Sequence, residues 1–256
     1  MTAKHSIDRS DEGPIAAGDT TTRPMEPGQK TGGAAAYVAA GTFVFGLLLA
    51  VTTLHGYVTA TDSASAVSQL LEHESMLALW NLVITILFGI ALVPLAIALR
   101  DRTAGTRGSG IGRVGLVFGL IWATVILAAG MVIGVGLTTV SVLAATDASA
   151  AEALWLTVDT IGNALGGGNE VVGGVWVILV GVSTWIGRAL PRWIATFGIV
   201  TGLAGLATMV PRLTDAGSVF GVTMIVWFSL VGVTLWHFQP AHRRLGRPSP
   251  APVAAG

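Results

Sequence analysis

Six long stretches of apolar residues constrain the fold of this chain more than any other feature. The middles of all six stretches lack Asp, Glu, Lys, Arg and His. A helix needs about 20 residues to cross a bilayer core of roughly 30 Å, whereas a membrane strand needs only about 10 residues of alternating pattern. The stretches therefore predict an all-α, polytopic transmembrane bundle of six helices. Their approximate bounds are 34–58, 75–99, 114–143, 171–186, 193–210 and 219–238.

Composition also indicates a membrane protein. Hydrophobic residues make up 52% of the chain and charged residues only 11%, against about 25% charged residues in soluble domains. The formal net charge is zero, so bulk charge gives no reason to expect nucleic acid, and the lipid bilayer is the predicted partner. The chain contains no cysteine, which excludes disulfides, thiolate metal sites and a cysteine nucleophile.

The polar ends of the chain divide it into three parts. Residues 1–32 are rich in Thr, Gly, Pro and Asp without apolar periodicity, which predicts a disordered cytoplasmic tail. Residues 33–239 contain the six predicted spans and form the transmembrane domain. Residues 240–256 are basic and rich in Pro and Ala, and they are predicted to form a second cytoplasmic tail.

The distribution of basic residues predicts the orientation. In a six-span arrangement, all of the 14 Lys and Arg residues except Arg212 lie on one side. The positive-inside rule assigns that side to the cytoplasm, which gives cytoplasmic N- and C-termini in a plasma membrane of bacterial type. The opposite loops, residues 59–74 and 144–170, carry Asp and Glu but no Lys or Arg.

The outer loop between the third and fourth spans contains a periodic segment. Its apolar residues recur at steps of three and four, with acidic and amide residues on another face, which is typical of an amphipathic helix. Asp147 or Ser149 is positioned to cap its start, and the glycines at 166–168 are positioned to end it. The apolar face comprises Ala151, Leu154, Val158, Ile161 and Leu165.

Five polar residues are the candidates for a ligand site on the outer side. Asn81 is the most notable deep polar residue, and it is predicted either to hydrogen-bond a neighbouring helix or to contact a substrate. Asn169 and Glu170 follow three glycines, where they form either a turn with a helix cap or part of an outward-facing cavity. Glu152 and Asp159 would join them in the second case.

Signals for catalysis, metals and cofactors are weak. His55 and His73 flank one outer loop and are interpreted as solvated interface residues, with haem or metal ligation as the alternative. The segment around His73 lacks the HExxH spacing of zinc hydrolases, and the chain contains no GxSxG nucleophile motif. We therefore predict no catalytic residue, no metal site and no cofactor, and enzyme activity is left open but disfavoured.

Pairs of glycines at four-residue spacing recur in the predicted spans. They match the pattern that lets membrane helices approach closely. We expect these pairs to pack helices within the bundle, with homo-oligomerisation as the alternative. The pairs are Gly115 and Gly119, Gly130 and Gly134, and Gly198 and Gly202.

The second half of the chain resembles a known family. The stretch GGGNEVVGGVWVILVGVSTWIGRALPRWIATFGIVTGLAGLATMVP is similar to the C-terminal half of the domain-of-unknown-function 4386 family, with Leu190-Pro191-Arg192 supplying its characteristic turn. The resemblance covers roughly residues 145–238. It implies a bacterial membrane protein of about six spans, and it implies no activity or functional residue.

Three classes of function remain open from the sequence. The leading hypothesis is a structural, regulatory or partner-binding membrane protein whose protein partner is unknown. The alternative is a small-molecule or lipid carrier or receptor with an outward-facing cavity near Asn169 and Glu170. A membrane enzyme or haem protein is the third. A polar cavity of several hundred Å³ that opens outward would favour the carrier or receptor.

Overall fold

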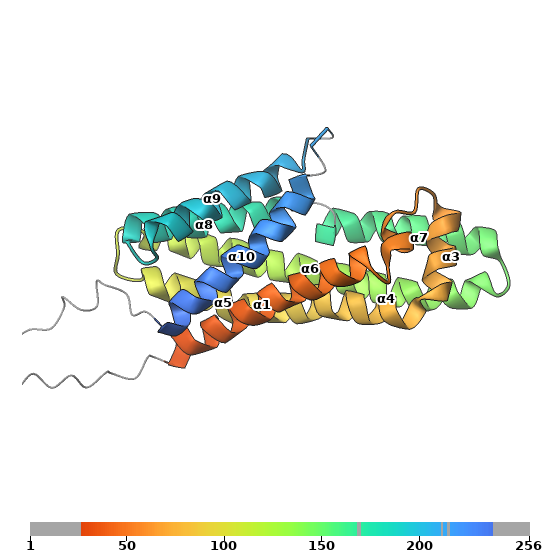
Figure 1. The fold of residues 1–256 in the computed structure, drawn as a ribbon, viewed down its shortest axis with the longest axis horizontal. Coiled ribbons are helices and arrows are strands. Elements are labelled where there is room, and N and C mark those ends of the chain that lie inside the picture. The colour runs from red at the N-terminus through yellow and green to blue at the C-terminus, as the bar shows by residue number, and fades with distance from the viewer. Residues whose placement is uncertain (1–26, 168–169, 211, 214–215, 238–256) are drawn as a thin grey trace, which may run out of the picture.

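The computed structural model describes residues 27–167, 170–210, 212–213 and 216–237, and in these residues it contains helices and no strands. The prediction of an all-helical chain is confirmed for this part. Figure 1 shows the arrangement of the helices. The elements are α1 (Pro27–Val51), α2 (His55–Val58), α3 (Ser63–Glu72), α4 (Glu74–Asn81), η1 (Leu82–Leu87), α5 (Phe88–Thr103), α6 (Ser109–Ala144), α7 (Ala148–Gly162), η2 (Asn163–Gly167), α8 (Val171–Gly187), α9 (Arg192–Ala207) and α10 (Ala216–His237).

Five helical runs in the described residues are long and apolar enough to cross a membrane. Four correspond to the first, second, third and sixth predicted spans, and the fifth is the run from Ala148 to Gly187, which includes the predicted fourth span. The predicted fifth span corresponds to α9, which is apolar but has only 16 residues. At 1.5 Å per residue α9 is about 24 Å long, somewhat less than a bilayer core. The bundle is therefore of the multi-pass membrane type.

Two predicted boundaries differ from the structure. Helix α1 begins at Pro27, so residues 27–32 are helical and do not belong to an irregular tail. The first predicted span also ends early, because α1 stops at Val51 and a turn separates it from the short helix α2. In that turn the Leu54 N–H donates to the Leu49 carbonyl at 2.8 Å. The predicted tails at 1–26 and 240–256 lie outside the described residues.

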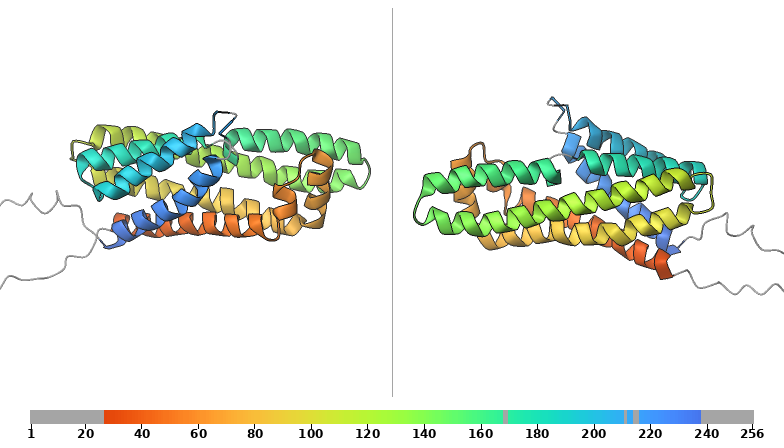
Figure 2. Two further views of the ribbon diagram at one scale, coloured as in Figure 1. Left: turned by 45° about the horizontal axis from the view of Figure 1, so that its top comes forward. Right: turned by 180° about the vertical axis from the view of Figure 1, so that it is seen from behind.

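Helix α6 connects two regions of the molecule (Figure 1). Toward one end it packs with α5 and α8, and these helices together with α1, α9 and α10 form what we call the main bundle. Toward the other end it packs with α4 and α7, and these elements with α2 and α3 form what we call the pocket region. Figure 2 shows α7 and α8 following one another along α6.

Each region has its own hydrophobic core. The main bundle is centred on an aromatic network of buried side chains from four helices and the partly buried Phe43 of α1, with ring centroids 5.1 to 6.4 Å apart. The pocket region has a smaller core built around Leu54, Leu70, Leu137 and Trp155. The residues of this aromatic network are Phe43, Phe88, Trp122, Trp176, Phe220, Trp227 and Phe228.

Glycines set the closest helix contacts of the main bundle. A Cβ added to Gly202 would lie 2.6 Å from the Gly174 carbonyl oxygen, and one added to Gly174 would lie 2.7 Å from the Gly202 carbonyl oxygen. The backbones of α8 and α9 therefore touch at this crossing, which only glycine permits. The predicted packing role is confirmed at Gly119, which faces Trp176, and at Gly198, which faces Trp227.

The end of the bundle where α1 begins and α10 ends is held by a buried arginine. Arg102 on α5 is 2% exposed. Its Nε donates to the Ala189 carbonyl in the turn between α8 and α9 at 2.7 Å, and its guanidinium also donates to Oε1 of Gln29 on α1 at 3.0 Å. One side chain thus ties three parts of the chain together. The Leu190-Pro191-Arg192 turn follows directly after this contact.

Candidate functional site

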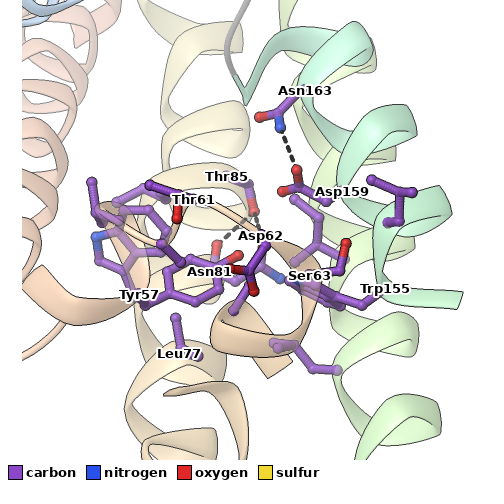
Figure 3. Close-up of a pocket in the computed structure, with 18 residues that line it drawn as sticks. Tyr57, Thr61, Asp62, Ser63, Leu77, Asn81, Thr85, Trp155, Asp159 and Asn163 are labelled. Atoms are coloured by element: carbon purple, nitrogen blue, oxygen red, sulfur yellow. Dashed lines mark hydrogen bonds between the residues drawn. The ribbon is translucent and has the colours of Figure 1, made fainter. Parts of the chain in front are cut away.

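A cavity of about 480 Å³ lies in the pocket region. Its walls come from α2, α3, α4, η1, α6, α7 and the first residue of η2, together with the turn at residues 60–62 (Figure 3). This volume falls within the range of small-molecule sites, about 300 to 1,000 Å³. The cavity lies at the end of the molecule opposite to the start of α1 and the end of α10.

Asn81 stands at the floor of the cavity, at the point where α4 passes into the π-helical segment η1. Its Nδ2 donates to the Gly130 carbonyl on α6 at 2.9 Å. The Thr85 hydroxyl donates to the Asn81 main-chain oxygen at 2.5 Å and lies 3.4 Å from Oδ1. The hydrogen bond to a neighbouring helix, one of the two roles predicted for Asn81, is therefore confirmed. Its side chain also lines the cavity, and π-bulges are frequent at functional sites.

Gly130 explains how Asn81 can reach α6. A Cβ at this position would overlap the Thr85 hydroxyl, so η1 and α6 approach more closely than side chains would permit. The close approach brings the Gly130 carbonyl within reach of the Asn81 amide. The wide turn of η1 and the glycine of α6 thus form one local unit.

Helix α7 lies in the segment where the sequence predicts an amphipathic helix, and it supplies one wall of the cavity. Its N-cap is Asp147, whose side chain accepts a hydrogen bond from the Ala150 N–H at 3.0 Å. Asp159 and Asn163 lie one turn apart and both line the cavity, where Asn163 Nδ2 donates to Asp159 Oδ2 at 2.9 Å. Glu152 lies on the same helix but does not line the cavity.

Three aromatic side chains surround the cavity. Tyr57 of α2 lies edge-on to Trp80 of α4, with ring centroids 6.5 Å apart, and edge-on to Trp155 of α7 at 6.2 Å. Burial raises the pKa of Tyr57 above its ordinary value, and the negative charge of Asp159 raises it further. The phenol is therefore neutral throughout the physiological range. Trp80 is fixed by its indole N–H, which donates to the Gly46 carbonyl on α1 at 3.0 Å.

Asp62 stands at the edge of the cavity and caps α3. Its carboxylate accepts a hydrogen bond from the Ser65 N–H at 2.8 Å. This backbone hydrogen bond holds the pKa of Asp62 below its ordinary value. The carboxylate is therefore ionised at neutral pH and remains exposed to solvent.

Glu170 lies in a second, more apolar cavity of about 280 Å³ between α1, η1, α6 and α10. Its N–H donates to the Thr208 hydroxyl at 3.3 Å. The two cavities share Trp80, Ile84 and Thr85 as lining residues. Gly166, at the break between α7 and α8, has φ of 133°, a conformation that favours glycine.

The five predicted site residues are therefore only partly brought together. Asn81 and Asp159 line the larger cavity, Glu170 lines the neighbouring one, and Glu152 lines neither. Asn169 lies outside the described residues. The sequence did not identify Tyr57, Trp155 and Asp62 as site residues, although the two loops predicted to lie outside carry Asp and Glu without Lys or Arg.

The lining of the larger cavity is acidic and aromatic. It contains two carboxylates, of Asp62 and Asp159, and no Lys, Arg or His. In the part of the chain that the structure describes, no group of three or more His, Asp or Glu residues is placed to hold a metal ion. The arrangement suits an organic ligand held by aromatic faces and a few polar groups.

The chain matches no known protein family, and no curated protein or solved structure is significantly similar to it. The resemblance to the domain-of-unknown-function 4386 family therefore stays a prediction.

Proposed function

We propose that this chain is a six-span plasma-membrane protein, with both termini in the cytoplasm, that binds a small molecule from the outside in the cavity of the pocket region. The observation that carries the proposal is the cavity of about 480 Å³ with a mixed polar and aromatic lining. Its position opposite the basic end of the bundle supports an outward opening under the positive-inside rule.

A receptor or binding protein fits the interior better than a carrier does. Below the two cavities, buried aromatic side chains fill the main bundle, and Phe88 and Trp122 form part of the wall of the smaller cavity. Trp176 and Trp227 are fully buried beneath them, with ring centroids 5.7 Å apart. A carrier would have to open this packed layer to release its substrate on the other side.

Cysteine labelling tests the cavity and the orientation together, since the chain contains no native cysteine. Ala66 lines the cavity, so we expect Ala66→Cys to react with a membrane-impermeant maleimide in intact cells. Gly110→Cys, exposed at the opposite end, should react only after the cells are permeabilised. Ala123→Cys, buried in the main bundle, is the unreactive control.

A binding role predicts protection of the Ala66→Cys thiol. The small-molecule fraction of an extract from cells that carry the protein should slow its labelling, while labelling of Gly110→Cys in permeabilised membranes stays constant. The proposal fails if Ala66→Cys is unreactive in intact cells, or if no small-molecule fraction slows its reaction.

The partner-binding role predicted from the sequence is the second candidate. It is favoured by a stripe of exposed apolar side chains on the part of α6 that extends beyond the main bundle, where Met131, Val135 and Val142 are 60 to 71% exposed. At about 54 Å, α6 is longer than a bilayer core is thick. Cross-linking from Val135→Cys to a second protein, or to a second copy of this chain, would support that role.

A further inference from the structure

The electrostatic character of the cavity narrows the class of ligand. The carboxylates of Asp62 and Asp159 line it, and both are committed to hydrogen bonds with uncharged donors, the Ser65 N–H and the Asn163 amide. No cationic side chain is present in the lining to neutralise them. An anionic ligand would therefore meet repulsion, and a cationic one would meet attraction.

The aromatic residues of the lining narrow the class of ligand further. Tyr57 lies between Trp80 and Trp155, and all three rings line the same cavity as the carboxylates. Aromatic faces attract cations through the ring quadrupole, and groups of such rings recognise quaternary ammonium ions. A bare metal ion is not suited to such a lining, because it requires several oxygen or nitrogen ligands at close range.

From this combination we infer that the cavity takes a small organic ammonium cation, with its charged group among Tyr57, Trp80 and Trp155 and its charge balanced by Asp62 and Asp159. This inference rests on the proposed binding function and names the chemical class of its ligand. The neutral phenol of Tyr57 adds a hydroxyl to the lining without adding charge.

The test compares the rates at which two thiol reagents modify Ala66→Cys in the full-length protein, purified in an uncharged maltoside detergent. One is a trimethylammonium thiosulfonate and the other is a sulfonate thiosulfonate of similar size. The measured quantity is the rate with the cationic reagent divided by the rate with the anionic one. This ratio should be about tenfold or more higher for Ala66→Cys than for a simple thiol in solution, because charge-lined clefts enrich ions of opposite sign. Choline should slow the reaction, and its uncharged analogue with a tert-butyl group in place of trimethylammonium should not.

Charge variants in the Ala66→Cys background provide matched controls. Asp159→Asn removes one charge and retains an oxygen that can accept from Asn163, and Asp62→Asn retains an N-cap residue of equal preference. Each should reduce the preference for the cationic reagent. Glu152 lies on α7, as Asp159 does, but it does not line the cavity, so Glu152→Gln should leave the preference for the cationic reagent unchanged.

The results separate this inference from the proposed function. If Ala66→Cys reacts with neither reagent, the cavity is closed and the binding function itself fails. If it reacts with both at the ratio of a simple thiol, or if the uncharged analogue protects as well as choline, the cavity stands and the cationic ligand is wrong. A loss of preference in Glu152→Gln equal to that in Asp159→Asn would also overturn the inference.

Discussion

The main bundle and the pocket region use their buried polar groups in different ways. In the main bundle, the long-range hydrogen bonds of buried Arg102 lie at the end where α1 begins. Within the packed interior, the hydroxyl groups of Thr184 and Thr234 bond carbonyls of their own helices, those of Val180 and Leu230, both at 2.7 Å. In the pocket region, Asn81 and Trp80 reach across to carbonyls of other helices. Hydrogen bonds within one helix suit a packed interior without ligands. Hydrogen bonds between helices fix the positions of the walls around a cavity.

The two regions meet where the helices depart from α geometry. The π-helical segments η1 and η2 both pack against α6 between the main bundle and the pocket region. Wider turns and a glycine with positive φ at Gly166 change the direction of the side chains that follow. We therefore expect substitutions in the main bundle to destabilise the whole fold, and substitutions beyond η1 and η2 to destabilise only the pocket region.

The largest expected effect comes from truncating a core tryptophan. Trp122→Ala in the main bundle should lower the free energy of unfolding by about 3 to 5 kcal/mol, because it leaves a large void among buried rings. Trp155→Ala should cost a similar amount within the smaller core of the pocket region. Hydrogen exchange should show lost protection throughout the bundle in the first variant, but only in α2, α3 and α7 in the second.

The same experiment can contradict the division into two regions. If Trp155→Ala reduces protection in α8, α9 and α10 as much as Trp122→Ala does, the pocket region and the main bundle unfold as one unit. Trp236→Ala is the matched control, because this tryptophan is 40% exposed and lies outside both cores. Its substitution should leave exchange in both regions close to that of the unaltered protein.

The next effect in size tests the backbone contact between α8 and α9. Gly202→Ala places a methyl group against the Gly174 carbonyl oxygen, and we expect a loss of about 2 kcal/mol. Gly41→Ala on α1 meets no atom within 4 Å and should be neutral or stabilising, since alanine favours helix. Melting temperatures of the purified variants measure both, and an equal change in the two would refute the predicted close contact.

The sequence predicted the helical class and the membrane type of the bundle, because uninterrupted apolar stretches have few other stable solutions. It did not predict the end of α1 at Val51, since residues 52–58 contain no proline, Asp, Glu, Lys or Arg that would mark the end of a helix. That unpredicted turn is what lets Tyr57 of α2 meet Trp155 of α7. Asn81 was identified because it is polar among apolar neighbours, whereas aromatic residues of a cavity look like core residues in the sequence.

A smaller effect is expected at the junction of the two regions. Asn81→Ala removes the hydrogen bond to the Gly130 carbonyl and should cost about 1 kcal/mol, in the range of interhelical hydrogen bonds in membrane proteins. Thr124→Val is the control, because the Thr124 hydroxyl is exposed and bonds only the Leu120 carbonyl of its own helix. Equal stability losses in the two variants would argue against a special role for the junction.

The smallest effect is a pH dependence confined to α3 of the pocket region. The pKa of Asp62 is lowered in the folded state by its hydrogen bond from the Ser65 N–H. The cap therefore contributes its full stability above the ordinary pKa of an aspartate, and this contribution is lost as the pH falls through the lowered folded value. Asp62→Asn should keep the cap and abolish the pH dependence, because asparagine caps about as well as aspartate without a charge.

Amide exchange in α3, corrected for the intrinsic effect of pH, measures the pH dependence of its stability. Identical acid dependence in the unaltered protein and in Asp62→Asn would show that another group controls α3. The main bundle should show no change between these variants, since the hydrogen bonds of the Asp62 carboxylate and carbonyl to Ser65 lie within α3 and its cap.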